Sequence, residues 1–85
     1  MLKYSFHPTA EKELSRLPVK IQKQIIAKLK ELCRFNHPLQ YHKIIKLKGK
    51  KFEQFRMRVG DYRIKFILRN SILKITHVQH RQVGY

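Results

Sequence analysis

The pattern of hydrophobic and polar positions divides the first half of the chain into a short strand and two helices. Residues 2–6 alternate between apolar and polar side chains, which predicts a strand. A helix is expected over residues 9–17, where Thr9 supplies the N-cap and Pro18 ends the helix. Over residues 19–34 the apolar side chains recur with the period of a helix, and lysines occupy the other side. The apolar stripe of this second helix comprises Ile21, Ile25, Ile26, Leu29, Leu32 and Cys33.

The second half of the chain alternates with the period of a strand. Turn residues interrupt it at a basic segment over residues 48–51, at Gly60-Asp61 and at Asn70-Ser71. This order predicts an α+β fold: an N-terminal strand, then a helical hairpin packed on one face of a four-stranded or five-stranded antiparallel sheet. We expect residues 1–85 to form a single domain, because compact domains rarely divide below about 100 residues. The predicted strands of this half span residues 44–47, 52–59, 62–68 and 72–80.

The turn at Gly60-Asp61 sets the expected register of the sheet. Glycine in the first position suits a two-residue type II′ hairpin, which pairs Arg58 with Arg63. Because side chains alternate between the two faces of a strand, an apolar and a polar face separate at once. The apolar face, which we expect to meet the helices, carries Phe55, Met57, Val59, Tyr62, Ile64, Phe66 and Leu68. The opposite face carries Gln54 and a group of four cations, here called the basic face: Arg56, Arg58, Arg63 and Lys65.

A two-residue turn at Asn70-Ser71 extends this register to the last strand. It pairs Phe66 with Ile75 and keeps the apolar face apolar. By the same alternation His77 falls on the core side, and Arg81 lies at the strand end, where alternation no longer predicts its side. The residues expected to join the basic face are Thr76, Val78 and His80.

The charge of the chain narrows its possible partners. It carries 20 Lys+Arg against 5 Asp+Glu, a formal net charge of +15. Residues 41–85 hold 12 of the basic and 2 of the acidic side chains, so the excess is concentrated in the predicted sheet. Self-repulsion of this size indicates a polyanion or an acidic protein as the partner. With 42% hydrophobic residues the chain can still form a core, which excludes a disordered polycation.

Cysteine content and hydropathy exclude several further classes. Cys33 is the single cysteine, so an internal disulfide and a zinc site of several thiolates are excluded, and its place on the apolar stripe favours a buried thiol. No apolar run approaches the ~18 residues of a membrane span, and the N-terminus lacks the apolar region of a signal peptide. We therefore expect a soluble cytoplasmic protein. No metal or other cofactor is expected, because Glu53 and Asp61 are too far apart to form a carboxylate site.

The basic face offers a surface for phosphate groups. Like charges directly opposite each other destabilise a sheet by a few tenths to about 1 kcal/mol per pair. If the face carried only lysines, a solvated surface whose charges prevent sheets from associating edge to edge would explain it. Arginine side chains, in contrast, have the planar geometry that matches phosphate oxygens. A nucleic-acid surface is therefore favoured. The residues expected to bind RNA are Arg56, Arg58, Lys65, Lys48, Lys50 and Lys51.

The C-terminal sequence HVQHRQVGY adds groups that could cleave RNA. Cleavage without a metal requires a base for the 2′-hydroxyl, cations for the charge that develops on phosphorus, and an acid for the leaving oxygen. The expected register places His80 near Arg63, where it would serve as a neutral base. Tyr85 is the alternative base, provided that nearby cations stabilise its phenolate. The expected catalytic set is Arg63, Arg81, Tyr85 and His80; the other histidines are interpreted as surface or core imidazoles.

Four segments of the chain together carry a family resemblance. The opening YSFHPTAEKELSRLP, the turn LKGK, the hairpin FRMRVGDYRIKF and the ending HVQHRQVGY resemble, in this order, the RelE/ParE superfamily of type II toxin–antitoxin toxins. The resemblance covers essentially the whole chain. It implies a small RelE-like toxin held inactive by a cognate acidic antitoxin of the RelB type, in a complex of higher oligomeric order. In the RelE branch it also implies metal-independent cleavage of mRNA on the ribosome, in which the 2′-hydroxyl attacks the adjacent phosphate and leaves a cyclic phosphate.

The resemblance also implies roles for individual residues. Arg63 matches the motif arginine that binds phosphate, and Arg56 falls where the family has a strand cation. Arg81 and Tyr85 match the tail residues that assist proton transfer and stack on the RNA. His80 lies where some RelE-like toxins have a histidine and others a lysine.

Two departures from the family pattern leave alternatives open. Gln54 occupies a strand position where RelE toxins have a lysine, so one cation is missing or is replaced by Arg58. The sequence stops at Tyr85, where many relatives continue into a helix, so the terminal carboxylate lies beside the proposed base. Either Tyr85 or His80 could then be the base. A ParE-like inhibitor of DNA gyrase and a non-catalytic nucleic-acid-binding module are the alternative functions.

Overall fold

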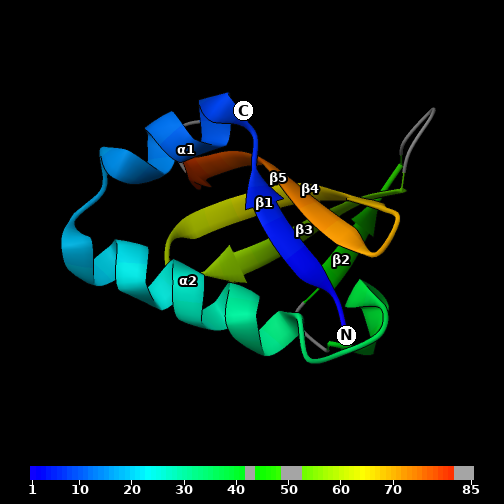
Figure 1. Cartoon of the computed structure of the whole chain (residues 1–85). Coiled ribbons are helices and arrows are strands. Elements are labelled where there is room, and N and C mark those ends of the chain that lie inside the picture. Colours follow the sequence, from blue (N-terminus) through cyan, green and yellow to red (C-terminus); the bar gives the residue numbers. More distant parts are fainter. Residues whose placement is uncertain (42–43, 49–52, 82–85) are drawn as a thin grey trace.

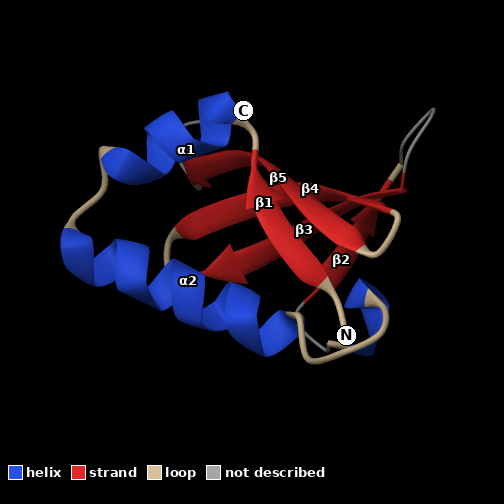
Figure 2. Ribbon diagram, viewed as in Figure 1, coloured by secondary structure: helices blue, strands red, loops and turns tan. Residues whose placement is uncertain are grey.

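The computed structural model describes residues 1–41, 44–48 and 53–81. These residues form the succession of strands and helices that the sequence predicts (Figures 1 and 2). The boundaries differ from the predicted ones by at most two residues. The elements are β1 (Lys3–Phe6), α1 (Pro8–Ser15), α2 (Val19–Leu32), the 3₁₀ helix η1 (Pro38–Gln40), β2 (Ile44–Leu47), β3 (Glu53–Val59), β4 (Tyr62–Arg69) and β5 (Ile72–His80).

The strands form one mixed sheet in the order β1-β5-β4-β3-β2. Neighbouring strands from β2 to β5 are antiparallel, as expected. In contrast, β1 pairs parallel with β5, so the sheet is not wholly antiparallel (Figure 1). The helical hairpin explains this difference, because it carries the chain from β1 to β2 at the opposite edge of the sheet. The meander that follows then ends with β5 beside β1 and running in the same direction.

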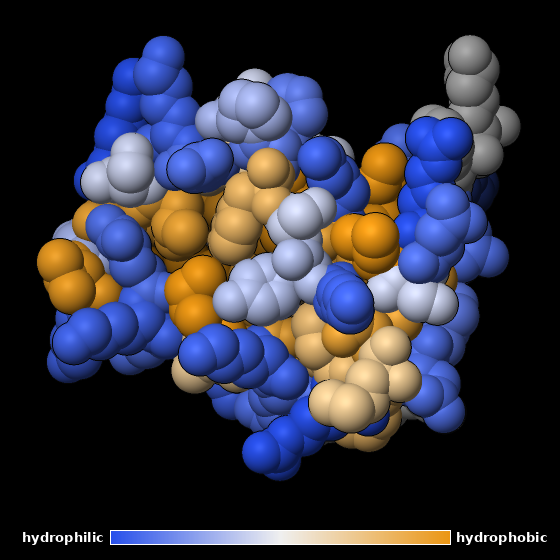
Figure 3. All heavy atoms as spheres, in the orientation of Figure 1, coloured by the Kyte–Doolittle hydropathy of each residue, from blue (hydrophilic) through white to orange (hydrophobic). Residues whose placement is uncertain are grey.

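The two helices and the apolar face of the sheet enclose the core. Ala10 of α1 and Leu29 of α2 are fully buried, and so are Phe55 and Phe66, whose rings stack with their centroids 5.7 Å apart. Figure 3 shows apolar side chains gathered between the two helices and β1, with hydrophilic side chains around them. The predicted apolar face is confirmed: Phe55, Met57, Val59, Ile64 and Phe66 are buried, and Tyr62 and Leu68 pack against them.

Both two-residue hairpin turns have the backbone conformations that their residues favour. Gly60 has a φ of 58°, as the first position of a type II′ turn requires. Asn70 and Ser71 have φ values of 52° and 62°, so both central residues of this turn are left-handed, as in a type I′ turn. The predicted pairing of Arg58 with Arg63 is confirmed, as is that of Phe66 with Ile75.

A β-bulge in β5 shifts the register beyond Ile75, which the sequence did not predict. Phe66 pairs with Ile75, but the next residue along β4, Lys65, pairs with His77, which leaves Thr76 as the extra residue. The prediction that Val78 joins the basic face is therefore wrong: Val78 lies opposite Ile64 and is 3% exposed. The bulge places apolar Val78 in the core, where strict alternation would have placed the polar ring of His77.

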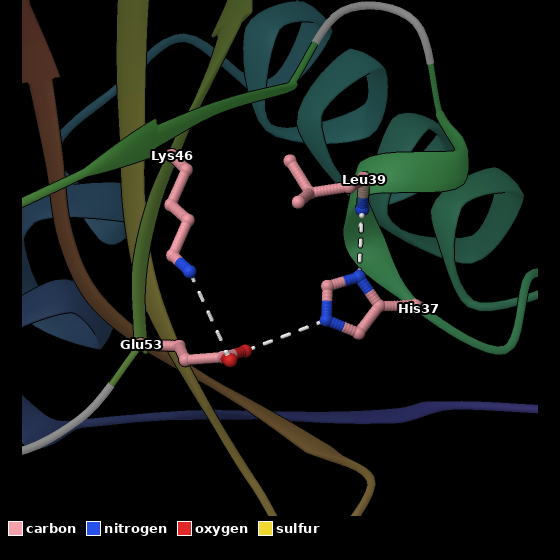
Figure 4. Close-up of polar contacts among 4 residues, drawn as sticks. All are labelled: His37, Leu39, Lys46 and Glu53. Atoms are coloured by element: carbon pink, nitrogen blue, oxygen red, sulfur yellow. Dashed lines mark hydrogen bonds and ion pairs between the residues drawn. The ribbon is translucent and has the colours of Figure 1, made fainter.

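The helix η1 is attached to the sheet through His37 (Figure 4). Nδ1 of His37 accepts a hydrogen bond from the Leu39 amide at 3.1 Å, so the ring proton is assigned to Nε2. Nε2 lies 3.4 Å from Oε2 of Glu53, whose other oxygen is 4.0 Å from Nζ of Lys46. This cluster joins η1 to β2 and β3 and gives His37 a structural role.

Candidate nucleic-acid interface

The basic face exists as the sequence predicts. In the β3–β4 pairing Arg58 lies opposite Arg63, and Arg56 lies opposite Lys65. Residues directly opposite in a sheet share a face, so the four cations form a compact group on the side away from the core. Arg58 is exposed, and its Nε donates to the carbonyl oxygen of Gly60 at 3.2 Å. That contact directs the guanidinium of Arg58 towards the hairpin turn.

Arg81 lies at the turn end of the same hairpin. Its amide donates to the carbonyl oxygen of Asp61 at 2.8 Å, so the pairing of β5 with β4 continues one residue beyond the strand. Its Nε is 3.6 Å from Oδ1 of Asp61, and both side chains are exposed. The Gly60-Asp61 turn thus positions Arg81 as well as the arginines of β3 and β4.

His80 does not lie where the sequence predicted. The bulge pairs it with Tyr62, and the two rings meet edge to face with their centroids 5.3 Å apart. Arg63 pairs instead with Gln79. His80 is therefore on the side of the sheet that carries Tyr62, and the expected position beside Arg63 on the basic face is wrong because the register shifts by one residue at Thr76.

His77 is the residue that the bulge brings to the basic face instead. It lies opposite Lys65, and its ring is 42% exposed. Its Nδ1 is buried and lies 3.5 Å from Oε1 of Glu13 in α1, while the same oxygen accepts a hydrogen bond from the Val78 amide at 3.0 Å. The signal for this arrangement was present in the sequence: strict alternation places a polar residue, His77, in the core and an apolar one, Val78, outside.

A central hollow of about 370 Å³ lies on the open side of the sheet at the bulge. Lys65 and His77 line it, together with Gln54 and Thr76. The hydroxyl of Thr76 donates to the carbonyl oxygen of Lys65 at 3.2 Å, which fixes the bulged backbone against β4. The central hollow therefore combines a cation, an imidazole and an amide next to the arginines of the basic face.

Other predicted residues fall at or beyond the limits of the described structure. Lys48 is exposed directly after β2. Lys50, Lys51 and Tyr85 lie outside the described residues, so the proposed base Tyr85 has no described position.

Within residues 1–41, 44–48 and 53–81, no three His, Cys, Asp or Glu side chains cluster as metal ligands would. In the same ranges no helix is long and apolar enough to cross a membrane.

Comparison with known proteins identifies one family. Residues 4–85 match the family model described as ParE toxin of type II toxin-antitoxin system, parDE. No curated protein gives a significant match.

Solved toxin structures are similar over nearly the whole chain. The RelE–RelB complex of the archaeon Pyrococcus horikoshii OT3 contains a chain that is 23% identical, with a TM-score of 0.77 and 98% of each chain covered. For the RelB–RelE complex of Methanococcus jannaschii the identity is 29% and the TM-score 0.72, with 96% of this chain and 92% of that chain covered. The isolated E. coli RelE toxin is 18% identical, with a TM-score of 0.75, and the match covers 94% of this chain and 84% of RelE. These likenesses confirm the predicted RelE-like fold.

Proposed function

The chain belongs to the ParE toxin family of type II toxin–antitoxin systems, within the RelE/ParE superfamily, and from this premise we propose that it is a ribosome-dependent mRNA endoribonuclease that inhibits translation. One observation carries the proposal: Arg56, Arg58, Arg63 and Lys65 lie on one open face of the sheet, and Arg81 lies at the same hairpin turn. Five cations in that arrangement suit a transition state in which negative charge develops on a phosphate.

In the proposed reaction each of these residues has a separate role. Arg63 and Arg56 bind the scissile phosphate, because arginine forks hold phosphate oxygens in a defined geometry. Arg81 stabilises the charge that develops on the oxygens during 2′-hydroxyl attack. The attacking 2′-hydroxyl gives its proton to a base, for which Tyr85 and His80 are the candidates. The bond between phosphorus and the 5′-oxygen breaks and this oxygen takes a proton from water, so the products are a 2′,3′-cyclic phosphate and a free 5′-hydroxyl. Metal ions take no part in this proposal.

The test is primer extension on mRNA from translating ribosomes. The wild-type protein should cut mRNA within the A-site codon. Cutting should continue when a chelator lowers free magnesium to the lowest concentration at which ribosomes stay intact. Arg63→Gln and Arg81→Gln should each lower the cleavage rate by about 100-fold or more, since each removes a cation that stabilises the transition state. Arg34→Gln, an exposed arginine just after α2, is the matched control and should cleave normally. Intact mRNA at doses that arrest growth would overturn the proposal.

The identity of the base can be resolved by two further variants. If Tyr85 is the base, Tyr85→Phe should lower kcat by about 100-fold or more, while His80→Gln changes it little. The reverse pattern would assign the base to His80. The position of His80 beside Tyr62, away from Arg63, favours Tyr85 in this comparison.

Inhibition of DNA gyrase is a second candidate function, because the description of the matching family model names the ParE toxin of the parDE system. A gyrase inhibitor of this kind would cause cleaved DNA to accumulate in a supercoiling assay with purified gyrase and would induce the SOS response in cells. The nuclease proposal predicts neither effect. A protein that does neither and still binds RNA tightly, with a steep salt dependence, would be a non-catalytic binding module.

We propose further that a cognate acidic antitoxin covers the basic face in the resting complex. The RelE chains of P. horikoshii and M. jannaschii were crystallised in complexes with RelB. A net charge of +15 favours a partner with an acidic segment, because complementary charges attract and reduce the repulsion among the cations. Co-purification with a small acidic protein encoded beside this chain is expected. If the isolated toxin were equally abundant and harmless without such a protein, this part of the proposal would fail.

A further inference from the structure

A second hollow, here called the distal hollow, lies on the open side of the sheet at the Asn70-Ser71 turn. Its volume is about 410 Å³. It lies at the opposite end of β4 from the Gly60-Asp61 turn, so none of the four residues of the basic face lines it. Its principal lining residues come from β1, β4 and β5: Ser5, Ile67, Arg69, Ile72, Lys74 and Thr76.

The register explains how this hollow combines an apolar floor with a polar rim. Lys74 lies between Ile67 of β4 and Ser5 of β1, its direct neighbours in the sheet. Ile72 pairs with Arg69 and is 40% exposed, so part of its apolar side chain is open to a ligand. Two isoleucines thus form an open apolar surface, and the cations and hydroxyls surround it.

The charge around the distal hollow is positive only. All five acidic side chains of the protein lie within the described residues, and none of them lines the hollow. Lys74 and Arg69 supply the positive charge of the described lining. An anionic ligand with one flat apolar part fits both features, because the apolar part covers the isoleucines and the anion meets the cations.

The distal hollow also adjoins the central hollow. Thr76, the extra residue of the bulge, lines both. A single-stranded polyanion that crosses the open side of the sheet from the basic face would pass Lys65 and His77 and then reach Ile67 and Lys74. Single-stranded RNA has a phosphate and a flat base in every nucleotide, which is the combination that the distal hollow can hold.

We propose that the distal hollow is a nucleotide subsite for single-stranded RNA, in which a base that flanks the cleaved bond lies on Ile67 and Ile72 and its phosphate contacts Lys74. This inference rests on the proposed nuclease function, since it extends the path of the same RNA strand. It assigns the affinity for the flanking nucleotide to β1, β4 and β5, away from the arginines that act on the scissile phosphate.

The test measures binding separately from cleavage. The probe is a fluorescein-labelled RNA hexanucleotide with 2′-O-methyl sugars, which cannot undergo 2′-hydroxyl attack, and its Kd is measured by anisotropy over a series of salt concentrations. Lys74→Gln should weaken binding about tenfold at low salt and lower the slope of log Kd against log salt by about 0.7, the value for one phosphate contact on a single strand. Ile72→Thr keeps a β-branched residue in the strand and should weaken binding without changing the slope.

The matched control is Lys23→Gln, which removes the same charge from the exposed surface of α2. It should leave the slope unchanged. Equal slopes for Lys74→Gln and Lys23→Gln would overturn the subsite, even if the wild-type protein cleaves mRNA. Weaker binding of a purified acidic antitoxin to Lys74→Gln, with unchanged RNA binding, would assign the hollow to the antitoxin and also overturn the inference. Failure of the nuclease proposal would appear separately, as uncut mRNA with the wild-type protein.

Discussion

At the scale of single residues, Arg58 and Arg63 illustrate how function and stability oppose each other. They lie directly opposite each other in β3 and β4, although like charges in that position destabilise a sheet. The neighbouring pair on this face, Arg56 and Lys65, repeats the arrangement. A face that is unfavourable in the isolated protein and favourable with a bound polyanion is better explained by binding than by folding.

Removing one of these cations should therefore leave the fold intact. Arg63→Gln is expected to keep or raise the free energy of unfolding, by up to about 1 kcal/mol, because it removes a repulsive cross-strand pair. Urea unfolding of Arg63→Gln beside the wild-type protein measures this change, and Arg34→Gln shows the effect of lowering the net charge elsewhere. Marked destabilisation would mean that Arg63 has a structural role.

Glu13 is the residue whose loss should affect the edge of β5 most. β1 ends at Phe6, and its pairing with β5 ends at Ile75, so no strand among the described residues lies beside the Val78 amide on this edge. Oε1 of Glu13 accepts the hydrogen bond of this amide at 3.0 Å. Glu13→Ala should lower the free energy of unfolding by about 1 to 3 kcal/mol, the usual range for a lost bond to a charged acceptor. Glu13→Gln keeps an acceptor oxygen and should lose less. Equal unfolding midpoints for Glu13→Ala and Glu11→Ala, an exposed neighbour, would contradict this role.

Cys33 gives a prediction about pH. The expected burial of its thiol is confirmed, since it is 8% exposed, and desolvation raises its pKa above the ordinary value of 9.0. A raised pKa in the folded state means that folding favours the protonated thiol. Its contribution to stability is therefore fully present below pH 9 and is lost as the pH rises through the folded pKa. Urea unfolding between about pH 8 and 10 should show a steeper loss of stability in the wild-type protein than in Cys33→Ala; parallel curves would contradict it.

At the scale of elements, the hairpins were predictable and the bulge was not. Gly60-Asp61 and Asn70-Ser71 each specify a short turn, and a two-residue turn fixes the pairing of the strands that it joins. The bulge at Thr76 has no turn residue to mark it. The local pattern of β5 shows only that strict alternation would bury His77 and expose Val78. The position of the bulge depends on tertiary contacts that this pattern does not contain: Val78 gains burial against Ile64, and α1 supplies Glu13 for the freed edge.

The same limit explains which parts of the site could be predicted. The basic face follows from alternation and a turn, so Arg56 and Arg63 were placed correctly. His80 was misplaced and His77 was missed because both lie beyond the bulge, where every alternation is reversed. The parallel pairing of β1 with β5 was also not predicted, since it depends on how the helical hairpin crosses the sheet.

The Asn70-Ser71 turn offers a test of the element that forms the distal hollow. Both residues are left-handed, which is unfavourable for serine and not for glycine. Ser71→Gly creates the favoured Asn-Gly pair and should raise the free energy of unfolding by about 0.5 to 1 kcal/mol. Thermal unfolding measures the gain, and Gly60→Ala should show the opposite sign, because Gly60 has a φ of 58°. A loss of stability in Ser71→Gly would mean that the serine side chain has a role of its own.

At the scale of the whole molecule, the net charge of +15 governs both stability and binding. Raising the salt concentration from about 0.05 M to about 0.5 M screens the repulsion among exposed cations. The melting temperature of the isolated protein should therefore rise, by about 4 to 8 °C if screening contributes 1 kcal/mol. RNA affinity should fall over the same range, because releasing counterions into a more concentrated salt solution gains less free energy. A melting temperature that falls with salt would show that attractive ion pairs dominate the surface.

The place of β1 in the sheet also has a consequence for the synthesis of the protein. Of the five described strands β1 is translated first, yet its neighbour in the sheet is β5, which is translated after the other four. The sheet cannot close, and α1 cannot pack against β5, until β5 has been translated. The ribosome-dependent nuclease that we propose would thus acquire its folded form only after β5 has left the ribosome that made it, which gives the proposed antitoxin, if encoded beside it, the first opportunity to bind.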